Sequence, residues 1–246
     1  MEHGQGERFR ASAGAMTAHL AIYDMDRTVT RRPTYPPFLR FAVRELAPWR
    51  VVLLPLVLLT TLAYGVRLID RARLKEINFQ LLLGRPSPAM LEPVVDRFAD
   101  RQLETNILPG ARARIAADKA AGRRLVLATA SYRLYAAAIA KRLGFDDVIA
   151  TDTLSDARGR ITATIDGANC YGLGKLDMIE AWLQREGLER DALHIRFYSD
   201  HISDSPVHRW ANEAFATNAH ARLIRLAETE GWEVLEWRDR RGAQSS

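Results

Sequence analysis

Short apolar runs of strand length alternate with single helical patterns along most of this chain. The strand patterns lie at residues 20–23, 125–128, 148–150, 195–198, 215–217 and 233–236, and a hairpin pattern covers residues 154–166. The helical patterns between them lie at residues 111–121, 134–143, 176–186 and 219–230. Strands joined by single helices require a mostly parallel sheet that helices cover on both faces. The sequence therefore predicts an α/β fold in three layers.

The segment from residue 31 to residue 105 breaks this alternation. It is helical, with Pro36, Pro48, Pro55 and Pro86 as expected helix boundaries, and it contains no strand pattern. A segment without strands cannot join the sheet, so we expect an inserted all-helical cap. The predicted division is a disordered lead at 1–18, a core at 19–30 and 106–238, a cap at 31–105, and a flexible tail at 239–246.

Composition and charge narrow the class of protein. Hydrophobic residues make up 48% and charged residues 26% of the 246 residues, which is ordinary for a globular protein, and the net charge is +5. A basic chain favours anionic partners, such as phosphate esters, nucleic acid or a membrane surface. The single cysteine excludes an internal disulfide. Together with residues 1–18, which hold no apolar signal segment, it favours a cytoplasmic location.

Four places in the predicted core carry polar residues that could act together. They are Asp24 and Asp26 after the first strand, Thr129 after the second, Lys175 before a helix, and Asp200 with Asp204 after residues 195–198. The carboxyl ends of parallel strands meet at one edge of a sheet, so these groups are expected to converge. Four carboxylates and one lysine leave excess negative charge, which Mg²⁺ would neutralise. The lysine and the hydroxyl group would then hold a phosphoryl group.

In this order the motifs DxDxT, T/S, K and DxxxD resemble those of the haloacid dehalogenase superfamily of phosphatases and phosphotransferases. The resemblance covers nearly the whole chain and implies a Rossmann-like core. The cap follows the first motif, as in subfamily IB, the branch that includes phosphoserine phosphatases. The apolar character of the cap is also similar to that of phosphatidylglycerophosphate phosphatases in that branch.

The resemblance implies a role for each matching residue. Asp24 would be the nucleophile that forms an aspartyl-phosphate, and Asp26 the general acid and then the base. Thr129 and Lys175 would bind and neutralise the phosphoryl oxygens. The implied substrate-binding residues are Thr129, Ala130, Lys175 and Arg27. The implied Mg²⁺ set is Asp24, Asp26 through its backbone carbonyl, Asp200, and Asp204, which would act through water or by supporting the direct ligands.

Three residues depart from the pattern of the family. Arg27 and His201 stand where smaller residues are common in relatives, and both could narrow or charge the mouth of the site. Pro33 stands where phosphoserine phosphatases carry a glutamate that holds the substrate's ammonium group. An amino-acid phosphate is therefore less expected as the substrate. Thr28 is expected to stabilise a turn.

Other candidate motifs are set aside. His194, His201 and His208 recur every seven residues, but they span a strand and its loop, so surface or packing roles are favoured over zinc binding. Cys170 is expected to be an inert thiol. The chain has no recognised nucleic-acid motif and no basic stripe interleaved with aromatic residues, so nucleic acid is not expected as a partner.

The cap contains sixteen residues without a charge, 51–66, between Arg50 and Arg67. Residues 31–75 hold nine basic and two acidic residues, a net charge of +7. The favoured interpretation is a hairpin buried in the cap, because the run is short for a membrane span and contains Pro55. The alternative is peripheral contact of residues 50–67 with the inner face of an anionic membrane.

The sequence therefore predicts a Mg²⁺-dependent phosphomonoesterase that acts on a phosphorylated small molecule or a lipid head group, such as phosphatidylglycerophosphate. A soluble phosphatase similar to the phosphoserine enzymes and a phosphotransferase or mutase remain open as alternatives. A non-catalytic membrane-associated binding protein is a weaker one.

Overall fold

The computed structural model describes residues 18–238 of the chain. The expected disordered ends therefore lie outside the described residues, except for Ala18, which is the first residue of a strand.

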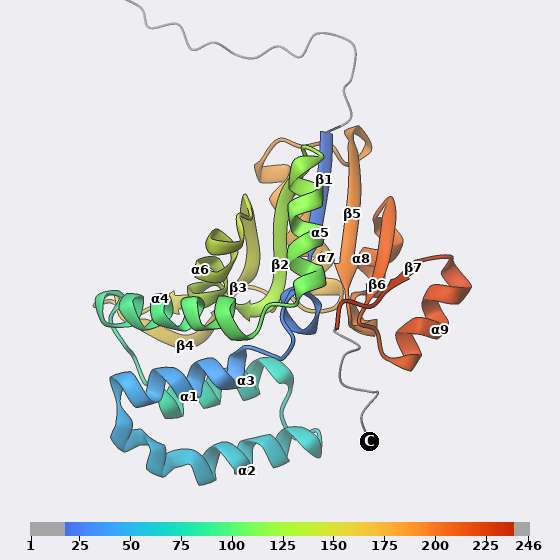
Figure 1. The fold of residues 1–246 in the computed structure, drawn as a ribbon. Helices are drawn as coiled ribbons and strands as arrows, with labels where there is room; N and C mark the ends of the chain where they lie inside the picture. Colours follow the sequence, from blue (N-terminus) through green and yellow to red (C-terminus); the bar gives the residue numbers. More distant parts are fainter. Residues whose placement is uncertain (1–17, 239–246) are drawn as a thin grey trace, which may run out of the picture.

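Within the described residues, seven strands form one sheet in the order β4-β3-β2-β1-β5-β6-β7 (Figure 1). The strands are β1 (Ala18–Tyr23), β2 (Arg124–Tyr132), β3 (Asp147–Ser155), β4 (Ile161–Asp166), β5 (Leu193–Ser199), β6 (Glu213–Thr217) and β7 (Glu233–Leu235). Neighbouring strands are parallel except β3 and β4, which form the predicted hairpin. The predicted α/β fold with a mostly parallel sheet is confirmed.

Side chains that alternate along β1 enter two different cores. Ala21 and Tyr23 pack in the core that α5 and α6 cover, whereas Leu20 and Ile22 pack against α7 and α8. Both faces of the strand are thus buried, as its continuous apolar sequence requires. The α-helices of the described chain are α1 (Tyr35–Leu46), α2 (Leu54–Gly65), α3 (Arg71–Leu82), α4 (Pro88–Thr105), α5 (Pro109–Ala120), α6 (Arg133–Leu143), α7 (Leu173–Arg185), α8 (Ser205–Trp210) and α9 (Ala221–Glu230).

Residues 31–105, called the insertion below, leave and re-enter the core at one place. Thr30 pairs with Ile107 in an isolated antiparallel bridge, and the N–H of Arg31 donates to the carbonyl oxygen of Asn106 at 2.7 Å. Figure 1 shows α4 nearest the sheet, α1 and α3 below it, and α2 farthest from the sheet. The division of the chain into core and cap at the expected boundaries stays a prediction.

Aromatic side chains join the insertion to the layer of helices on the sheet. Phe98 of α4 packs edge-on against both Phe38 of α1 and Tyr135 of α6. Phe79 of α3 packs edge-on against Tyr132 at the end of β2. All five rings are buried in one continuous apolar cluster, so the insertion is fixed over the carboxyl ends of the strands.

The apolar run of the insertion is not buried, and the buried-hairpin interpretation is wrong. A 3₁₀ turn (Pro48–Leu53) and α2 contain no buried residue, and Leu58 and Leu62 are 62% and 59% exposed. Helix α2 packs beside α3, and its Val57 is only partly buried against the apolar cluster of the insertion. Within the described residues, Pro48–Gly65 is the one helical stretch long and apolar enough to cross a membrane.

Candidate active site

The site begins where β1 ends. The N–H of Asp24 donates to the carbonyl oxygen of Tyr198 at 2.9 Å, which continues the pairing of β1 with β5. The chain then makes a tight turn through residues 25–29, in which Arg27 takes a positive φ of 64°. The hydroxyl of Thr30 donates to the carbonyl oxygen of Met25 at 3.1 Å and closes this turn.

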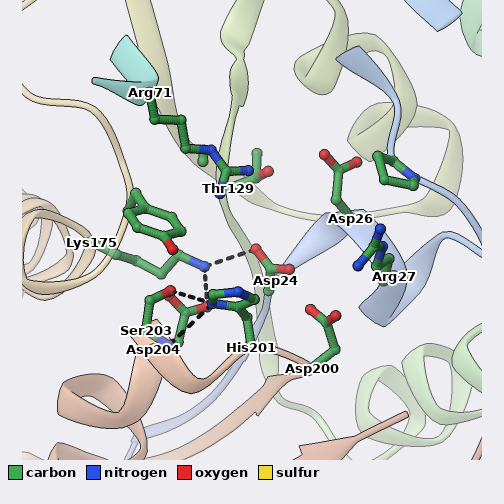
Figure 2. A pocket seen from close by; sticks show the side chains of 13 residues that line it. Asp24, Asp26, Arg27, Arg71, Thr129, Lys175, Asp200, His201, Ser203 and Asp204 are labelled. Carbon is green, nitrogen blue, oxygen red and sulfur yellow. Dashed lines mark hydrogen bonds and ion pairs between the residues drawn. The ribbon is translucent and has the colours of Figure 1, made fainter. Parts of the chain in front are cut away.

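The carboxyl ends of β1, β2 and β5 surround a cavity of about 240 Å³, called the polar cavity below (Figure 2). The structure brings together there every residue that the sequence analysis named for the site: Asp24, Asp26, Arg27, Thr129, Ala130, Lys175, Asp200 and Asp204. Five residues not named as binding or catalytic groups complete the lining: Pro33, Arg71, Tyr171, His201 and Ser203. The catalytic and binding roles expected for the eight predicted residues stay predictions.

Lys175 links two of the carboxylates. Its ammonium lies 2.8 Å from Asp24 Oδ1 and 2.6 Å from Asp204 Oδ2, and the side chain is 2% exposed. Burial by itself lowers the pKa of Lys175, but the charges of Asp204 and Asp24 outweigh burial and hold this pKa above its ordinary value. The lysine is therefore a fixed positive charge at the base of the polar cavity.

The three buried carboxylates titrate differently. Burial raises the pKa of Asp24 to about 6 and that of Asp200 to about 7, and repulsion from Asp204 adds to both shifts. Burial acts the same way on Asp204, but Lys175 and the hydroxyl of Ser199, which donates at 2.7 Å, hold the pKa of Asp204 below its ordinary value. Asp204 therefore keeps its charge beside the lysine.

Thr28 joins the ends of β1 and β5. Its hydroxyl oxygen accepts the N–H of Asp200 at 2.9 Å and lies 3.4 Å from Asp24 Oδ2 and 3.5 Å from Asp200 Oδ1. The expected turn-stabilising residue thus also holds the two carboxylates on one side of the polar cavity. Among the described residues, the Asp200 carboxylate has one hydrogen-bond contact, with the Thr28 hydroxyl.

This donor set fits Mg²⁺. Asp24 and Asp200 are buried and repel each other, and the carboxylate of Asp200 has only a long contact, to the Thr28 hydroxyl at 3.5 Å. Lys175 neutralises Oδ1 of Asp24, so the pair of hard oxygen ligands still carries negative charge that a cation would balance. Within residues 18–238 no three His, Cys, Asp or Glu side chains form a metal-binding group. The expected set needs only two such side chains, those of Asp24 and Asp200, with the carbonyl oxygen of Asp26 as a third ligand.

Asp26, labelled in Figure 2, lies next to Thr34 in the first residues of the insertion. Its Oδ1 accepts the N–H and the hydroxyl of Thr34 at 3.0 and 2.8 Å, and its Oδ2 accepts the hydroxyl of Ser131 at 3.2 Å. Burial raises the pKa of Asp26, although these hydrogen bonds act in the opposite direction. A raised pKa favours the protonated form that a general acid requires.

The second strand end supplies neutral donors. The hydroxyl oxygen of Thr129 accepts the N–H of Ser131 at 3.1 Å, so its own proton can be donated to an oxyanion in the polar cavity. Thr129, Ala130 and Ser131 lie inside β2, which continues to Tyr132 instead of ending at residue 128 as predicted.

Two basic residues of α3 reach the site, and the sequence analysis missed both. Arg71 lines the polar cavity and its guanidinium lies 4.6 Å from the centre of the Tyr171 ring. Lys75 donates to the carbonyl oxygen of Ala130 at 2.7 Å. Their signal was present in the basic run of residues 31–75, which the membrane-contact alternative assigned to an anionic surface. Their spacing of four places them on one face of a helix.

The three regularly spaced histidines have different surroundings. His208 is buried and stacks on Trp232, and His194 is partly exposed beside Glu213, in agreement with packing and surface roles. His201 instead lines the polar cavity, where its Nδ1 lies 2.7 Å from the Ser203 hydroxyl. Burial raises the pKa of Cys170 to about 12, which fits an inert thiol.

Solved structures with the same arrangement exist. One is a protein of unknown function from Bordetella pertussis Tohama I, with a TM-score of 0.78 and 24% identity over 89% of this chain and 99% of that chain. A substrate-bound phosphoserine phosphatase has a TM-score of 0.59 and 18% identity over 91% of this chain and 95% of its own. These likenesses show a shared fold.

Sequence comparison adds a family and a relative. Phosphoserine phosphatase SerB1 of Mycobacterium tuberculosis is 31% identical over 157 residues, which are 64% of this chain and 50% of the relative. The chain thus spans about half the length of this curated relative. Residues 21–209, which contain every predicted site residue, match the haloacid dehalogenase-like hydrolase family. The motifs, the sheet and this match agree, and the chain belongs to the haloacid dehalogenase-like hydrolase family.

Proposed function

We propose that the protein is a phosphatase that hydrolyses phosphate monoesters through an aspartyl-phosphate on Asp24. The observation that carries the proposal is the contact of Lys175 with Asp24 at 2.8 Å, beside Asp200, in a cavity that the insertion covers. A carboxylate can attack phosphorus only where cations reduce the charge of the phosphoryl oxygens. Lys175 provides one such cation.

In the first step an oxygen of Asp24 attacks phosphorus, and the bond from phosphorus to the leaving oxygen breaks. Asp26 donates its proton to that leaving oxygen. Thr129 and Lys175 bind the phosphoryl oxygens as their charge develops. Asp24 Oδ1 is the oxygen beside Lys175, whereas Oδ2 lies 3.4 Å from the Thr28 hydroxyl.

In the second step water attacks phosphorus of the aspartyl-phosphate. Asp26, now ionised, accepts a proton from this water, the bond from phosphorus to Asp24 breaks, and inorganic phosphate leaves. Mg²⁺, held by Asp24, Asp200 and the carbonyl oxygen of Asp26, would supply additional positive charge to the phosphoryl oxygens. Asp204 acts through Lys175, which it holds in place.

Hydrolysis of p-nitrophenyl phosphate tests this proposal. The wild-type protein is expected to release phosphate with Mg²⁺ and to lose activity with a chelator. Asp24→Asn should abolish turnover and leave the circular dichroism spectrum unchanged. Asp177→Asn, an exposed acid of α7, is the matched control and should retain activity. Full turnover by Asp24→Asn would overturn the assignment of the nucleophile.

For the natural substrate, we propose a phosphate on a lipid head group, such as phosphatidylglycerophosphate. The support is the apolar surface of Pro48–Gly65, of which nothing is buried, and the net charge of +7 over residues 31–75. An apolar helix ringed by arginines can lie on an anionic membrane, and each basic residue near that surface contributes about 1 kcal/mol. The proposed location is the cytoplasmic face of a membrane.

Sedimentation with vesicles tests the membrane contact. The protein is expected to pellet with anionic vesicles, less so with neutral ones, and less at high salt because charges are then screened. Leu58→Glu combined with Leu62→Glu should abolish pelleting, whereas Leu154→Glu, an exposed leucine of β3, should not. Without pelleting under any condition, a soluble small-molecule phosphate becomes the substrate class. Transfer of the phosphoryl group to a second substrate instead of water would indicate a phosphotransferase or mutase.

A further inference from the structure

A second cavity, of about 650 Å³, lies between α1, α2 and α3 and is called the apolar cavity below. Four residues line both cavities, namely Asp26, Pro33, Arg71 and Ala130. We infer that the apolar cavity binds the hydrocarbon part of the phosphate ester whose phosphoryl group lies in the polar cavity. This inference rests on the proposed function and specifies which part of the substrate the insertion recognises.

The surface that lines the apolar cavity is mostly apolar. Leu39 comes from α1, Leu54 and Val57 come from α2, and Leu74 and Leu82 come from α3. Its volume lies in the range of small-molecule sites, roughly 300–1,000 Å³. Binding of an apolar group in a cavity with such walls is favourable, because apolar surface is removed from water.

Three of the polar side chains in these walls, Tyr35, Lys75 and Asn78, already have partners in the protein. The hydroxyl of Tyr35 donates to the carbonyl oxygen of Lys75 at 2.6 Å. Thr60 donates to Asn78 Oδ1 at 2.7 Å, and the ammonium of Lys75 donates to Ala130 and Asn169 at 2.7 and 3.1 Å. Because these three side chains have partners, they do not require a polar ligand, and the space between the apolar walls favours a hydrocarbon.

The position of Asp26 gives the direction of the substrate. A general acid must lie beside the leaving oxygen, and Asp26 lies where the two cavities meet. The organic part of the ester is attached to that leaving oxygen, so it extends from Asp26 into the apolar cavity. Pro33 and Arg71 lie at the same junction, so the charged group there besides Asp26 is a basic one.

A series of n-alkyl monophosphates, kept below the concentration at which they form micelles, tests the inference without any vesicle. Each methylene that enters the apolar cavity is expected to raise kcat/KM about fourfold, until the cavity is full and the values level off. A series that is flat from ethyl to decyl phosphate would overturn the inference. Hydrolysis of no phosphate ester at all, p-nitrophenyl phosphate included, would instead overturn the proposed function.

A matched pair of variants locates the effect. Val57→Trp fills the apolar cavity from α2, and we expect the ratio of kcat/KM for decyl phosphate to that for ethyl phosphate to fall at least tenfold. Val234→Trp, the same change at an exposed position of β7, should leave this ratio as in the wild type. Thr61→Trp, which fills the cavity from the next turn of α2, repeats the test if Val57→Trp does not fold. Equal ratios in the wild type and in both cavity variants would exclude the apolar cavity as the binding site.

Discussion

The ammonium of Lys75 in α3 lies 2.7 Å from the carbonyl oxygen of Ala130 in β2, so a buried cation connects the insertion to the strand end that lines the polar cavity. The same ammonium lies 4.3 Å from the centre of the Tyr132 ring. Burial, with a contribution from Arg71, lowers the pKa of Lys75 from 10.5 to about 7. This connection is therefore sensitive to pH.

Replacing Lys75 with Met should change how stability depends on pH. The unfolded lysine keeps its proton up to about pH 10.5, whereas the folded one releases it near pH 7, so wild-type stability rises between these values. The difference in free energy of unfolding, wild type minus Lys75→Met, should increase by about 3 kcal/mol from pH 6 to pH 9. Urea unfolding at both pH values measures it. Lys141→Met, at an exposed position of α6, is the control, and equal pH dependence of both variants would contradict the prediction.

Asp26→Asn should separate the two chemical steps. The p-nitrophenolate group leaves without a proton, so the aspartyl-phosphate should still form, but its hydrolysis should slow about 10²- to 10⁴-fold without the base. Rapid-quench kinetics should then show a burst of one p-nitrophenolate per enzyme before slow turnover. Steady-state turnover at the wild-type rate would remove Asp26 from the mechanism.

Thr28→Val should weaken both the fold and the metal site. The buried N–H of Asp200 loses its acceptor, which should lower the free energy of unfolding by about 1–3 kcal/mol. Because the same hydroxyl holds Asp24 and Asp200, the Kd for Mg²⁺ should also rise. Thr28→Ser keeps the hydroxyl and is the control. Urea unfolding and Mg²⁺ titration of the two variants provide the comparison, and identical results for Val and Ser would refute it.

Mg²⁺ affinity should fall as pH is lowered. Burial raises the pKa of Asp200 to about 7 and that of Asp24 to about 6, so protons compete with the cation below these values. The Kd should be nearly constant above pH 8 and should rise about tenfold per pH unit for each carboxylate that is protonated. Isothermal titration calorimetry between pH 5.5 and 8.5 measures this. A Kd that does not vary with pH would show that these carboxylates do not bind the metal.

The strands and the polar cavity could be predicted because local patterns encode both. Asp24, Asp26 and Asp200 follow buried apolar runs, and parallel strands bring such positions to one edge without further information. The first and last residues of the helices were less predictable. Gly172, Leu173 and Gly174 give a weak helix signal, yet α7 begins at Leu173, after Gly172 makes a turn with a φ of 62°. The short helix α8 was missed, because six residues are too few for a periodic pattern.

Contacts that depend on docking between distant segments could not be predicted. Lys75 reaches Ala130 across 55 positions of the chain, and nothing local distinguishes it from the arginines around it. The exposure of α2 has the same origin, since an apolar helix is buried or exposed according to whether its neighbours leave room for it. Here Phe38, Phe79 and Phe98 are buried, and the space that α2 encloses with α1 and α3 is the apolar cavity.

The bridge between Thr30 and Ile107 has a consequence for how proteins of this kind diversify. Because the chain leaves and returns through neighbouring residues, the intervening helices can be lengthened, shortened or exchanged without moving any strand of the sheet. Mutations that reshape the apolar cavity are therefore separated from Asp24, Lys175 and Asp200, which come from other segments. Selection can therefore alter which substrates such a protein binds while its catalytic residues stay the same.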